Sequence, residues 1–285
     1  MKILYAARSH TGYVRRGNED NLYCDGVTMT PEARETPFSV DGEAEPPCVF
    51  AVFDGMGGES EGEFASLAAA LVLAEHTPMI RSASSKVEVD SAVQSFVREA
   101  NGVICDAMRA RSVRMGTTAA LIIAAGGTVY PYSLGDSRIY AMMEGKLSQI
   151  SEDHTLSMQK ARMGIITEEE ARMDRDRNKL TLHLGIFEDE MTIEASAAAP
   201  LTAGRACRMM LCSDGLTDMV ANERMEEIMR GARSPDDAAG LLVASALENG
   251  GRDNVTCVVL DLPFADGAQG SEGFFHKLRR YLFCE

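Results

Sequence analysis

Residues 48–58 read Cys48-Val49-Phe50-Ala51-Val52-Phe53-Asp54-Gly55-Met56-Gly57-Gly58, and the expected architecture can be built outward from this stretch. Its first six residues are apolar and include two valines and two phenylalanines, which favours a buried strand over a helix. The Asp-Gly dipeptide that follows is a turn signal. The sequence therefore places a carboxylate, Asp54, where a core strand reaches the surface.

Similar apolar runs recur along the chain and predict further strands. They cover residues 117–124, 128–133, 138–143, 209–212 and 255–260. Gly126-Gly127 separates the first two of these runs and predicts a hairpin. Residues 29–47 mix Pro, Glu, Gly and Thr, so we expect an exposed loop or hairpin excursion there.

Three segments have the pattern of helices. Apolar residues spaced i, i+3, i+4 and i+7 predict one buried stripe over residues 64–72 and another over residues 89–108. A third helix is expected to begin at Ser234 as N-cap, with Asp237 completing a capping box, and to end near residues 249–251. Strands that pair as hairpins, with helices grouped between them, predict an α+β sandwich of antiparallel sheets with helices on the outer faces.

The composition excludes several classes of protein. Of the 285 residues, 45% are apolar, which allows a sizeable core and excludes a disordered or collagen-like chain. Asp and Glu number 43 against 28 Lys and Arg, giving a formal net charge of −15. A chain this acidic is poorly suited to neutralise phosphates, so no nucleic-acid partner is expected.

Three features predict a cytoplasmic protein. The apolar run at the N-terminus is interrupted by Arg8 and is too short for a signal peptide. No stretch approaches the ~20 apolar residues of a membrane span, so no integral membrane segment is expected. The seven cysteines are scattered, and Cys105, Cys212 and Cys257 lie inside apolar runs, as buried free thiols of a reducing compartment do. We also expect a monomer.

Acidic residues stand at the ends of the expected strands, beside Gly, Ser or Asn. These acids are Glu19, Asp20, Asp54, Asp136, Asp214 and Asp253. Carboxylates that converge raise one another's pKa, and a divalent cation removes that cost. An oxygen-only set without paired Cys or His favours Mg²⁺ or Mn²⁺ over Zn²⁺. Taken singly, each acid is better explained as an ordinary turn or cap residue, so only their convergence would indicate a metal site.

Short motifs that contain these acids follow one another in a characteristic order over roughly residues 5–262. They are Val14-Arg15 through Asn18-Glu19-Asp20, Asp54-Gly55-Met56-Gly57-Gly58, Gly116-Thr117-Thr118, Gly135-Asp136-Ser137-Arg138, Asp153-His154, Arg177-Asn178 with Leu184-Gly185, Ser213-Asp214-Gly215-Leu216 and Asp253-Asn254. In these motifs the chain resembles the metal-dependent protein phosphatases, the type 2C serine/threonine phosphatases. Met56 stands where eukaryotic members carry a His proposed to protonate the leaving group. This points to the bacterial branch and leaves the general acid unassigned.

The resemblance implies a four-layer αββα sandwich, two antiparallel sheets flanked by helix pairs, with two Mn²⁺ or Mg²⁺ ions at one sheet edge. In that arrangement Asp54 bridges the two ions. Glu19 and the backbone carbonyl of Gly55 bind one ion, and Asp214 and Asp253 bind the other.

The resemblance also implies a third, weaker metal site at Asp136 and Asp214, and a role for Asp20 through metal-bound water. A hydroxide bridging two cations would attack phosphorus in line, with no phosphoenzyme intermediate. Arg15 occupies the family's phosphate-binding position, and its planar guanidinium suits two phosphate oxygens. The adjacent Arg16 is expected to be an ordinary surface residue.

The expected phosphatase domain covers residues 1–262, and a linker and short tail cover residues 263–285. Residues 151–178 resemble the family's mobile flap, with helical stretches around residues 156–163 and 167–173; they either select protein substrates or form a solvated linker. Asp174-Arg175-Asp176 replaces the His-Pro usual there. The basic, apolar tail either docks on a partner or membrane surface or packs back on its own body.

These features predict an enzyme that hydrolyses phosphoserine and phosphothreonine in proteins, acting on the targets of a serine/threonine kinase. The first alternative is a catalytically weak pseudophosphatase that serves as a binding or regulatory module. The presence of Glu19, Asp54, Asp214 and Asp253 argues against it. Two further alternatives are a phosphatase confined to one regulator of transcription and a metal-binding protein that handles no phosphate, against which Arg15 argues.

Overall fold

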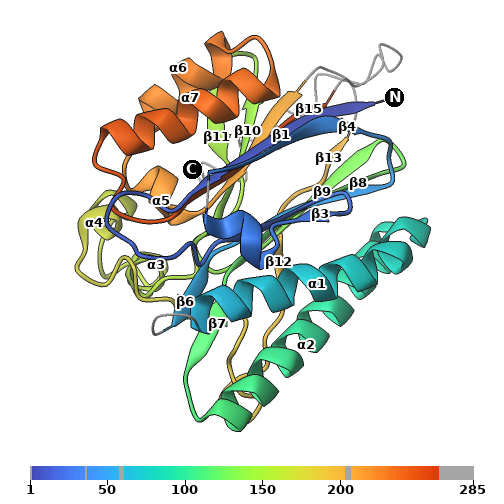
Figure 1. The fold of residues 1–285 in the computed structure, drawn as a ribbon, viewed down its shortest axis with the longest axis vertical. Coiled ribbons are helices and arrows are strands. Elements are labelled where there is room, and N and C mark those ends of the chain that lie inside the picture. The colour runs from blue at the N-terminus through green and yellow to red at the C-terminus, as the bar shows by residue number, and fades with distance from the viewer. Residues whose placement is uncertain (1, 36, 58–60, 203–206, 263–285) are drawn as a thin grey trace.

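The computed structural model of the chain describes residues 2–35, 37–57, 61–202 and 207–262. Two antiparallel sheets lie face to face, and helices cover both outer faces (Figure 1). This is the four-layer αββα sandwich that the sequence predicts. No helix in the described part of the chain is long and apolar enough to cross a membrane.

The first sheet has six strands, and the strands formed by residues 3–10 and 255–262 lie next to each other within it. In spatial order the strands are β11 (Lys146–Gln149), β10 (Arg138–Met143), β14 (Cys207–Cys212), β15 (Val255–Leu262), β1 (Ile3–His10) and β4 (Phe38–Ala44). The last described strand, β15, pairs with β1 over seven registered positions from Leu4 opposite Asp261 to His10 opposite Val255.

The second sheet contains the strand from which the sequence analysis began. Its order is β12 (Ser196–Ala197), β9 (Thr128–Leu134), β8 (Ala119–Ala125), β5 (Cys48–Phe53), β2 (Asn21–Cys24) and β3 (Val27–Thr28), and β13 (Leu201–Thr202) also pairs with β9. A separate two-stranded ribbon of β6 (Gly55–Gly57) and β7 (Met115–Thr117) follows directly from β5.

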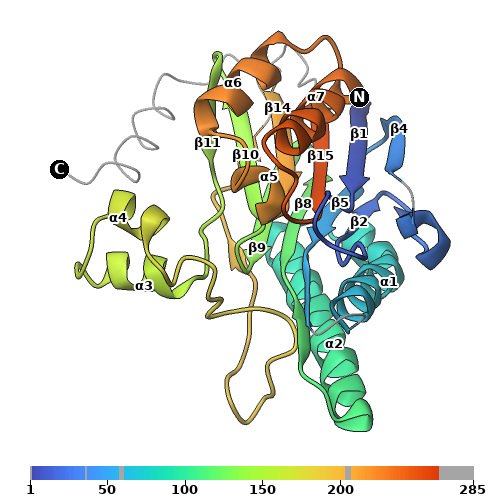
Figure 2. The same cartoon turned by 60° about the vertical axis from the view of Figure 1, so that its left-hand side comes forward.

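Helices form the outer layers. The seven-stranded sheet is covered by α1 (Glu61–Ser82) and α2 (Lys86–Arg111), and the six-stranded sheet by α6 (Asn222–Gly231) and α7 (Pro235–Glu248). The short α5 (Asp214–Thr217) follows β14. Two small helices, α3 (Leu156–Arg162) and α4 (Glu168–Met173), extend to one side of the sandwich (Figure 2).

Three apolar cores separate the four layers, and β5 contributes to two of them. Val49, Ala51 and Phe53 face α1 and α2, whereas Phe50 and Val52 face the other sheet. Because successive side chains of a strand point to opposite faces, a strand buried on both faces is apolar throughout. The third core lies between the six-stranded sheet and helices α6 and α7.

The expected strands and helices are confirmed, with longer or slightly shifted bounds. The run 117–124 is interrupted at Thr118, where β7 ends and β8 begins. The hairpin at Gly126-Gly127 is present, with both glycines at positive φ. The capping box at Ser234 is half formed: Ser234 accepts the Asp237 N–H, but the Asp237 carboxylate accepts the N–H of Arg233 instead of that of the cap residue.

The expectation of a loop over residues 29–47 is wrong in part. This segment contains β4, which pairs with β1 at the edge of the six-stranded sheet. Its side chains alternate between half-buried and exposed, as expected for an edge strand, but the Gly and Pro residues around it conceal the alternation. The predictions for the linker and tail over residues 263–285 lie outside the described residues.

Candidate active site

The structure brings the predicted acids together at one end of the sandwich, although they come from both sheets. Asp54 follows β5, Asp136 precedes β10, Asp214 begins α5 after β14, and Asp253 lies just before β15. Asp20 comes directly before β2. The charges of Asp20, Asp214, Asp136 and Asp253 all act on Asp54, in that order of strength.

Burial and mutual repulsion raise the pKa values of these acids. Burial, followed by the neighbouring carboxylates, raises the pKa of Asp54 well above its ordinary value. Burial is also the main cause that raises the pKa of Asp136, with Asp214 adding to it. Burial raises the pKa of Asp214 to about 6, and Asp253 contributes next. This end of the sandwich therefore disfavours negative charge unless a cation is present.

Asp54 and Asp214 interact through their side chains, and this interaction partly offsets the rise in the pKa of Asp214 that burial causes. Within the described residues, no three Asp, Glu, His or Cys side chains converge into a complete cage for a metal ion. The arrangement is thus an open cluster of oxygen ligands, as repulsion between carboxylates would produce.

The surroundings of Asp20 are independent evidence that this site suits a polar ligand. Its side chain is 1% exposed, and its Oδ2 accepts a hydrogen bond of 2.8 Å from Ser213 Oγ. Its Oδ1 is buried without a hydrogen-bond partner among the described residues. Burial raises the pKa of Asp20 to about 7. A buried carboxylate oxygen normally has a partner, so these residues fit a hydrated cation beside them.

The Gly116-Thr117-Thr118 motif holds Asp54 in place from the adjacent strand. The Thr118 N–H and the Thr117 hydroxyl each donate to the Asp54 carbonyl at 2.9 Å. The Thr118 hydroxyl accepts the Asp54 N–H at 3.0 Å and lies 2.6 Å from Ser137 Oγ, next to Asp136. One threonine pair thus fixes the backbone of Asp54 and connects it to the loop that carries Asp136.

Glu19 packs against the turn that follows Asp54. A side chain on Gly55 would collide with the backbone oxygens of Glu19 and Gly62, and a side chain on Gly62 would meet the Glu19 carboxyl group at 2.9 Å. Glycine at Gly55 and Gly62 therefore lets Glu19 approach the start of α1 closely.

Arg15 lies at the rim of the cluster. Its side chain is 51% exposed, and its Nη2 donates to Asp253 Oδ2 at 2.7 Å. This position gives the guanidinium access to solvent beside an acid of the cluster. Arg16 is exposed, as expected.

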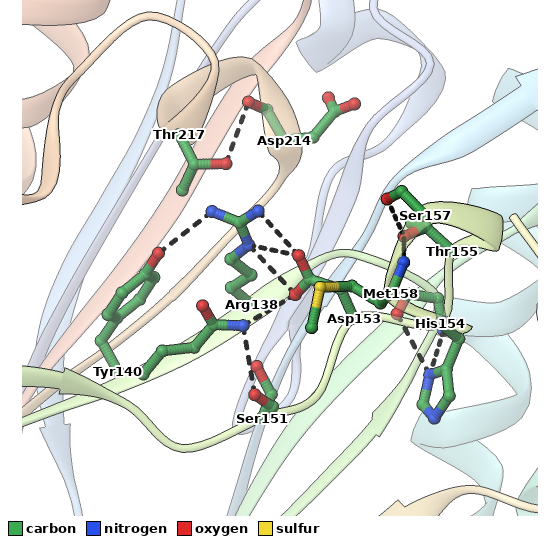
Figure 3. Close-up of polar contacts among 12 residues, drawn as sticks. Arg138, Tyr140, Ser151, Asp153, His154, Thr155, Ser157, Met158, Asp214 and Thr217 are labelled. Atoms are coloured by element: carbon green, nitrogen blue, oxygen red, sulfur yellow. Dashed lines mark hydrogen bonds and ion pairs between the residues drawn. The ribbon is translucent and has the colours of Figure 1, made fainter. Parts of the chain in front are cut away.

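A polar network that the sequence analysis did not single out connects the cluster to residues 151–178, the flap segment. Arg138, two residues after Asp136, donates to both oxygens of Asp153 at 2.7 to 3.1 Å and to the Tyr140 hydroxyl (Figure 3). The charge of Arg138 lowers the pKa of both Asp136 and Asp214. Arg138 is therefore a fixed cation beside the acidic cluster, with Asp153 as its counter-ion.

His154 holds the same segment by its backbone and its ring. Its N–H donates to the Gly135 carbonyl at 2.9 Å, and its Nδ1 lies 3.1 Å from the Gly135 amide nitrogen. Its Nε2 lies 2.8 Å from Ser196 Oγ. Burial lowers the pKa of His154, which favours the neutral imidazole, and its two ring nitrogens bridge Gly135 and Ser196. The Asp153-His154 motif thus fixes the base of the flap segment.

The unusual Asp174-Arg175-Asp176 stretch has a role inside the flap segment. The Lys160 ammonium, from α3, lies 3.0 Å from Asp174 and 2.6 Å from Asp176. Lys179 also pairs with Asp176 at 2.7 Å. Hydrogen bonds from these lysines hold the pKa of Asp176 at about 2. The two aspartates connect the end of α4 to α3 by ion pairs.

The sandwich, with acids gathered at one of its ends, has the arrangement that the resemblance to the type 2C serine/threonine phosphatases implies. A family model described as "Protein phosphatase 2C" matches residues 38–243, and the chain belongs to this family. A curated relative, the serine/threonine protein phosphatase PstP of Mycobacterium tuberculosis, is 34% identical over 271 residues. That match covers 94% of this chain but 47% of PstP, so the chain spans about half the length of that relative.

A relative of similar length and two solved structures agree with this assignment. The serine/threonine phosphatase stp of Listeria monocytogenes is 30% identical over 256 residues, which cover 89% of this chain and 94% of stp. The crystal structure of M. tuberculosis PstP/Ppp superposes with a TM-score of 0.75 at 32% identity, covering 92% of this chain and all of that one. The catalytic domain of PstP in complex with two manganese ions gives a TM-score of 0.73 at 30% identity, with the same coverage.

Proposed function

We propose that residues 1–262 form a metal-dependent phosphatase domain that removes phosphate from phosphoserine and phosphothreonine in proteins. The observation that carries this proposal is the cluster of Asp54, Asp136, Asp214 and Asp20 at one end of a protein phosphatase 2C sandwich, where burial and then neighbouring carboxylates raise the pKa of each acid. Repulsion within such a cluster lowers the stability of the metal-free protein. A bound cation relieves this repulsion, which adds to the free energy of metal binding.

Two Mn²⁺ or Mg²⁺ ions are the proposed cofactors. We assign Asp54 to both ions, Glu19 and the Gly55 carbonyl to one, and Asp214 and Asp253 to the other. The oxygen-only ligands and the two manganese ions in the PstP complex support this assignment. A third, weaker site at Asp136 and Asp214 is part of the same proposal, and the charge of Asp214, which adds to the burial that raises the pKa of Asp136, supports it.

When bound, two such cations make water acidic enough to act as a nucleophile near neutral pH and neutralise charge on the phosphoryl oxygens. The chain's own residues bind and orient the reactants. Ser213 fixes Asp20 through Oδ2, which leaves Asp20 Oδ1 to accept a hydrogen bond from water in the site. Arg15 presents an exposed guanidinium beside Asp253, where two of its N–H groups can bind phosphate oxygens.

The proposed substrates are proteins phosphorylated by a serine/threonine kinase, and the proposed compartment is the cytoplasm. Free, buried thiols support a reducing compartment, and all the cysteines whose side chains are described are of this kind: Cys24, Cys48, Cys105, Cys212 and Cys257. We also propose that the protein acts as a monomer.

The test is hydrolysis of p-nitrophenyl phosphate by protein stripped of metal with a chelator, with and without added Mn²⁺, beside an Asp54→Ala variant. We expect hydrolysis only with Mn²⁺ and only in the wild type. Phosphopeptides carrying phosphoserine, phosphothreonine or phosphotyrosine then define the substrate class. Binding of Mn²⁺ without any hydrolysis would replace the proposal by that of a binding module.

A further inference from the structure

Asn254 lies next to Asp253, and its side chain hydrogen-bonds to the loop that carries Arg15. The side chain is 4% exposed. The loop, residues 11–20, connects β1 to β2 and contains no helix or strand. Its conformation therefore depends on contacts with the rest of the protein.

The side-chain amide of Asn254 hydrogen-bonds to both ends of this loop. Asn254 Nδ2 donates to the carbonyls of Thr11 and Gly17, both at 2.9 Å, and Asn254 Oδ1 accepts the N–H of Glu19 at 2.8 Å. The three bonds join positions on either side of Arg15, so the loop is held at its start and at its end. These bonds join residues that lie 235 to 243 positions apart in the sequence.

The hydrogen-bonding pattern requires asparagine. Two carbonyls face the nitrogen of the side chain and one N–H faces its oxygen, so the amide orientation is fixed by its partners. A carboxylate of the same shape has no N–H to donate and would place an oxygen against two carbonyl oxygens. An apolar side chain would leave all three backbone groups without their partner in a buried position.

The same residue adjoins the other parts of the cluster. The Asp253 carboxylate accepts the N–H of Asn254 at 2.9 Å with Oδ1 and pairs with Arg15 through Oδ2. A side chain on Gly215, next to Asp214, would collide with the Asn254 carbonyl. Asn254 therefore contacts the segments that carry Glu19, Arg15, Asp253 and Asp214.

We propose that Asn254 is a positioning residue, which sets the distance between the phosphate-binding Arg15 and the metal ligands Glu19 and Asp253. This inference rests on the proposed function for the roles of those three residues. Asn254 touches neither substrate nor metal. It acts by holding the Arg15 loop and the Glu19 backbone against the start of β15.

A matched control exists in the same chain. Asn101 on α2 is 5% exposed and also bridges two backbone groups: it donates to the Ile186 carbonyl at 2.9 Å and accepts the Gly185 N–H at 2.7 Å. It holds a different loop. Asn101→Ala and Asn254→Ala therefore remove the same kind of buried amide clamp, one from the Arg15 loop and one from the segment around Gly185.

The first measurement is hydrogen exchange by mass spectrometry on both variants. Asn254→Ala is expected to speed exchange over residues 11–19, and Asn101→Ala only over its own partner segment around residues 185–186. Asn254→Asp keeps the acceptor for the Glu19 N–H but loses both donors. It is expected to loosen residues 11–17 while Glu19 stays protected. Unchanged exchange over residues 11–19 in both Asn254 variants would overturn the proposal.

The second measurement is functional. Asn254→Ala is expected to weaken Mn²⁺ binding, measured by calorimetry, by on the order of tenfold and to raise KM for p-nitrophenyl phosphate by a similar factor. In an Arg15→Ala background the same change should raise KM less than about twofold, because residues acting through one another are not additive. Equal effects of Asn254→Ala and Asn101→Ala on Mn²⁺ binding and KM would reduce Asn254 to a stabilising residue and overturn the inference.

The two proposals fail in different ways. A wild-type protein without hydrolysis would remove the proposed function, while the exchange pattern and the Mn²⁺ titration would still decide whether Asn254 positions Glu19. A wild-type protein that hydrolyses phosphate, with Asn254 variants no different from the Asn101 variant, would keep the function and remove the inference.

Discussion

Carboxylates at the two ends of the six-stranded sheet have opposite electrostatic surroundings. At one end, Asp261 of β15 receives two hydrogen bonds from Arg208, at 2.7 and 2.9 Å, and Arg208 also donates to two carbonyls at the end of α6. At the other end, Asp136 and Asp214 face further acids, which raise their pKa values. The same strands thus carry paired charges where they only stabilise and clustered like charges where we propose that they bind metal.

The difference shows how a binding site can be recognised without its ligand. Charge pairing is the usual condition of carboxylates that are partly buried, because an unpaired buried charge is costly. Asp54, Asp136 and Asp214 violate this condition together and at one place. Protons relieve the repulsion among these acids in the metal-free protein, and we propose that a pair of cations relieves it when the protein is at work.

The largest effect is expected from removing one acid of the cluster. Asp214→Asn should lower turnover of p-nitrophenyl phosphate at saturating Mn²⁺ by on the order of a hundredfold or more, because a neutral amide is a poor ligand for a hard cation. Asp261→Asn, at the opposite end of the same sheet, should keep wild-type turnover. Equal turnover in the two variants would contradict the proposal that only one end of the sheet binds metal.

The next effect is a dependence of stability on pH. Burial raises the pKa of Asp20 to about 7 and of Asp214 to about 6, so the folded protein holds protons that the unfolded chain releases above about pH 4. The free energy of unfolding of metal-free protein should therefore fall as pH rises from about 4 to about 7, by about 1.4 kcal/mol per retained proton and pH unit. Calorimetric melting at several pH values measures this, and Asp20→Asn should make the slope smaller.

Mn²⁺ should reverse that loss. A cation that binds only the folded state stabilises it by about 2.7 kcal/mol at a free concentration of one hundred times its Kd. The melting temperature should rise between micromolar and millimolar Mn²⁺, and more strongly at pH 7 than at pH 5, because fewer protons then compete with the cation for the carboxylates. A melting temperature that does not respond to Mn²⁺ at pH 7 would contradict the assignment of the cluster as a metal site.

A smaller effect is expected at the base of the flap segment. Asp153→Asn removes the counter-ion of Arg138 and should lower the free energy of unfolding by about 1.5–3 kcal/mol, as for other hydrogen bonds to charged groups. Its neighbour Glu152 pairs with Arg162 on the surface, so Glu152→Gln should change it by less than about 1 kcal/mol. Denaturant unfolding measures both, and limited proteolysis should cut residues 151–178 faster only in Asp153→Asn.

The smallest effect belongs to the paired end of the sheet. Asp261→Asn should cost about 1 kcal/mol of stability, because Arg208 is still held by the carbonyls of Met229 and Ala232. Its pH dependence between pH 4 and 7 should match that of the wild type. A change in that slope would mean that the two ends of the sheet are electrostatically coupled.

The sequence predicts the acids well because each follows or precedes an apolar run, and strand ends are visible in the hydrophobic pattern. It also predicts β5, β9 and β10 closely, since each is apolar and bounded by turn residues. The sequence does not show which of these acids lie close together in the fold. Asp54 belongs to one sheet and Asp214 to the other, and the packing of two sheets leaves no local signal in either segment.

Contacts between distant segments account for the rest of what the sequence does not reveal. Asn254 appears beside Asp253 as one more polar turn residue, and only the fold shows that it bonds to Thr11, Gly17 and Glu19. The pair of Arg138 and Asp153 is likewise formed by tertiary structure. The edge strand β4 was not predicted, because half-buried strands depend more on their neighbours than on their own composition.

The position of β15 between β14 and β1 has a consequence for biosynthesis. While the chain is being made, β1 and β14 remain sheet edges with unpaired backbone groups, because the strand that separates them is translated last among the described elements. Pairing across almost the whole chain is also slow to form. A nascent chain that stops before residue 253 lacks Asp253, Asn254 and β15 together. The acidic cluster is therefore completed only after Asp253 and β15 have been translated.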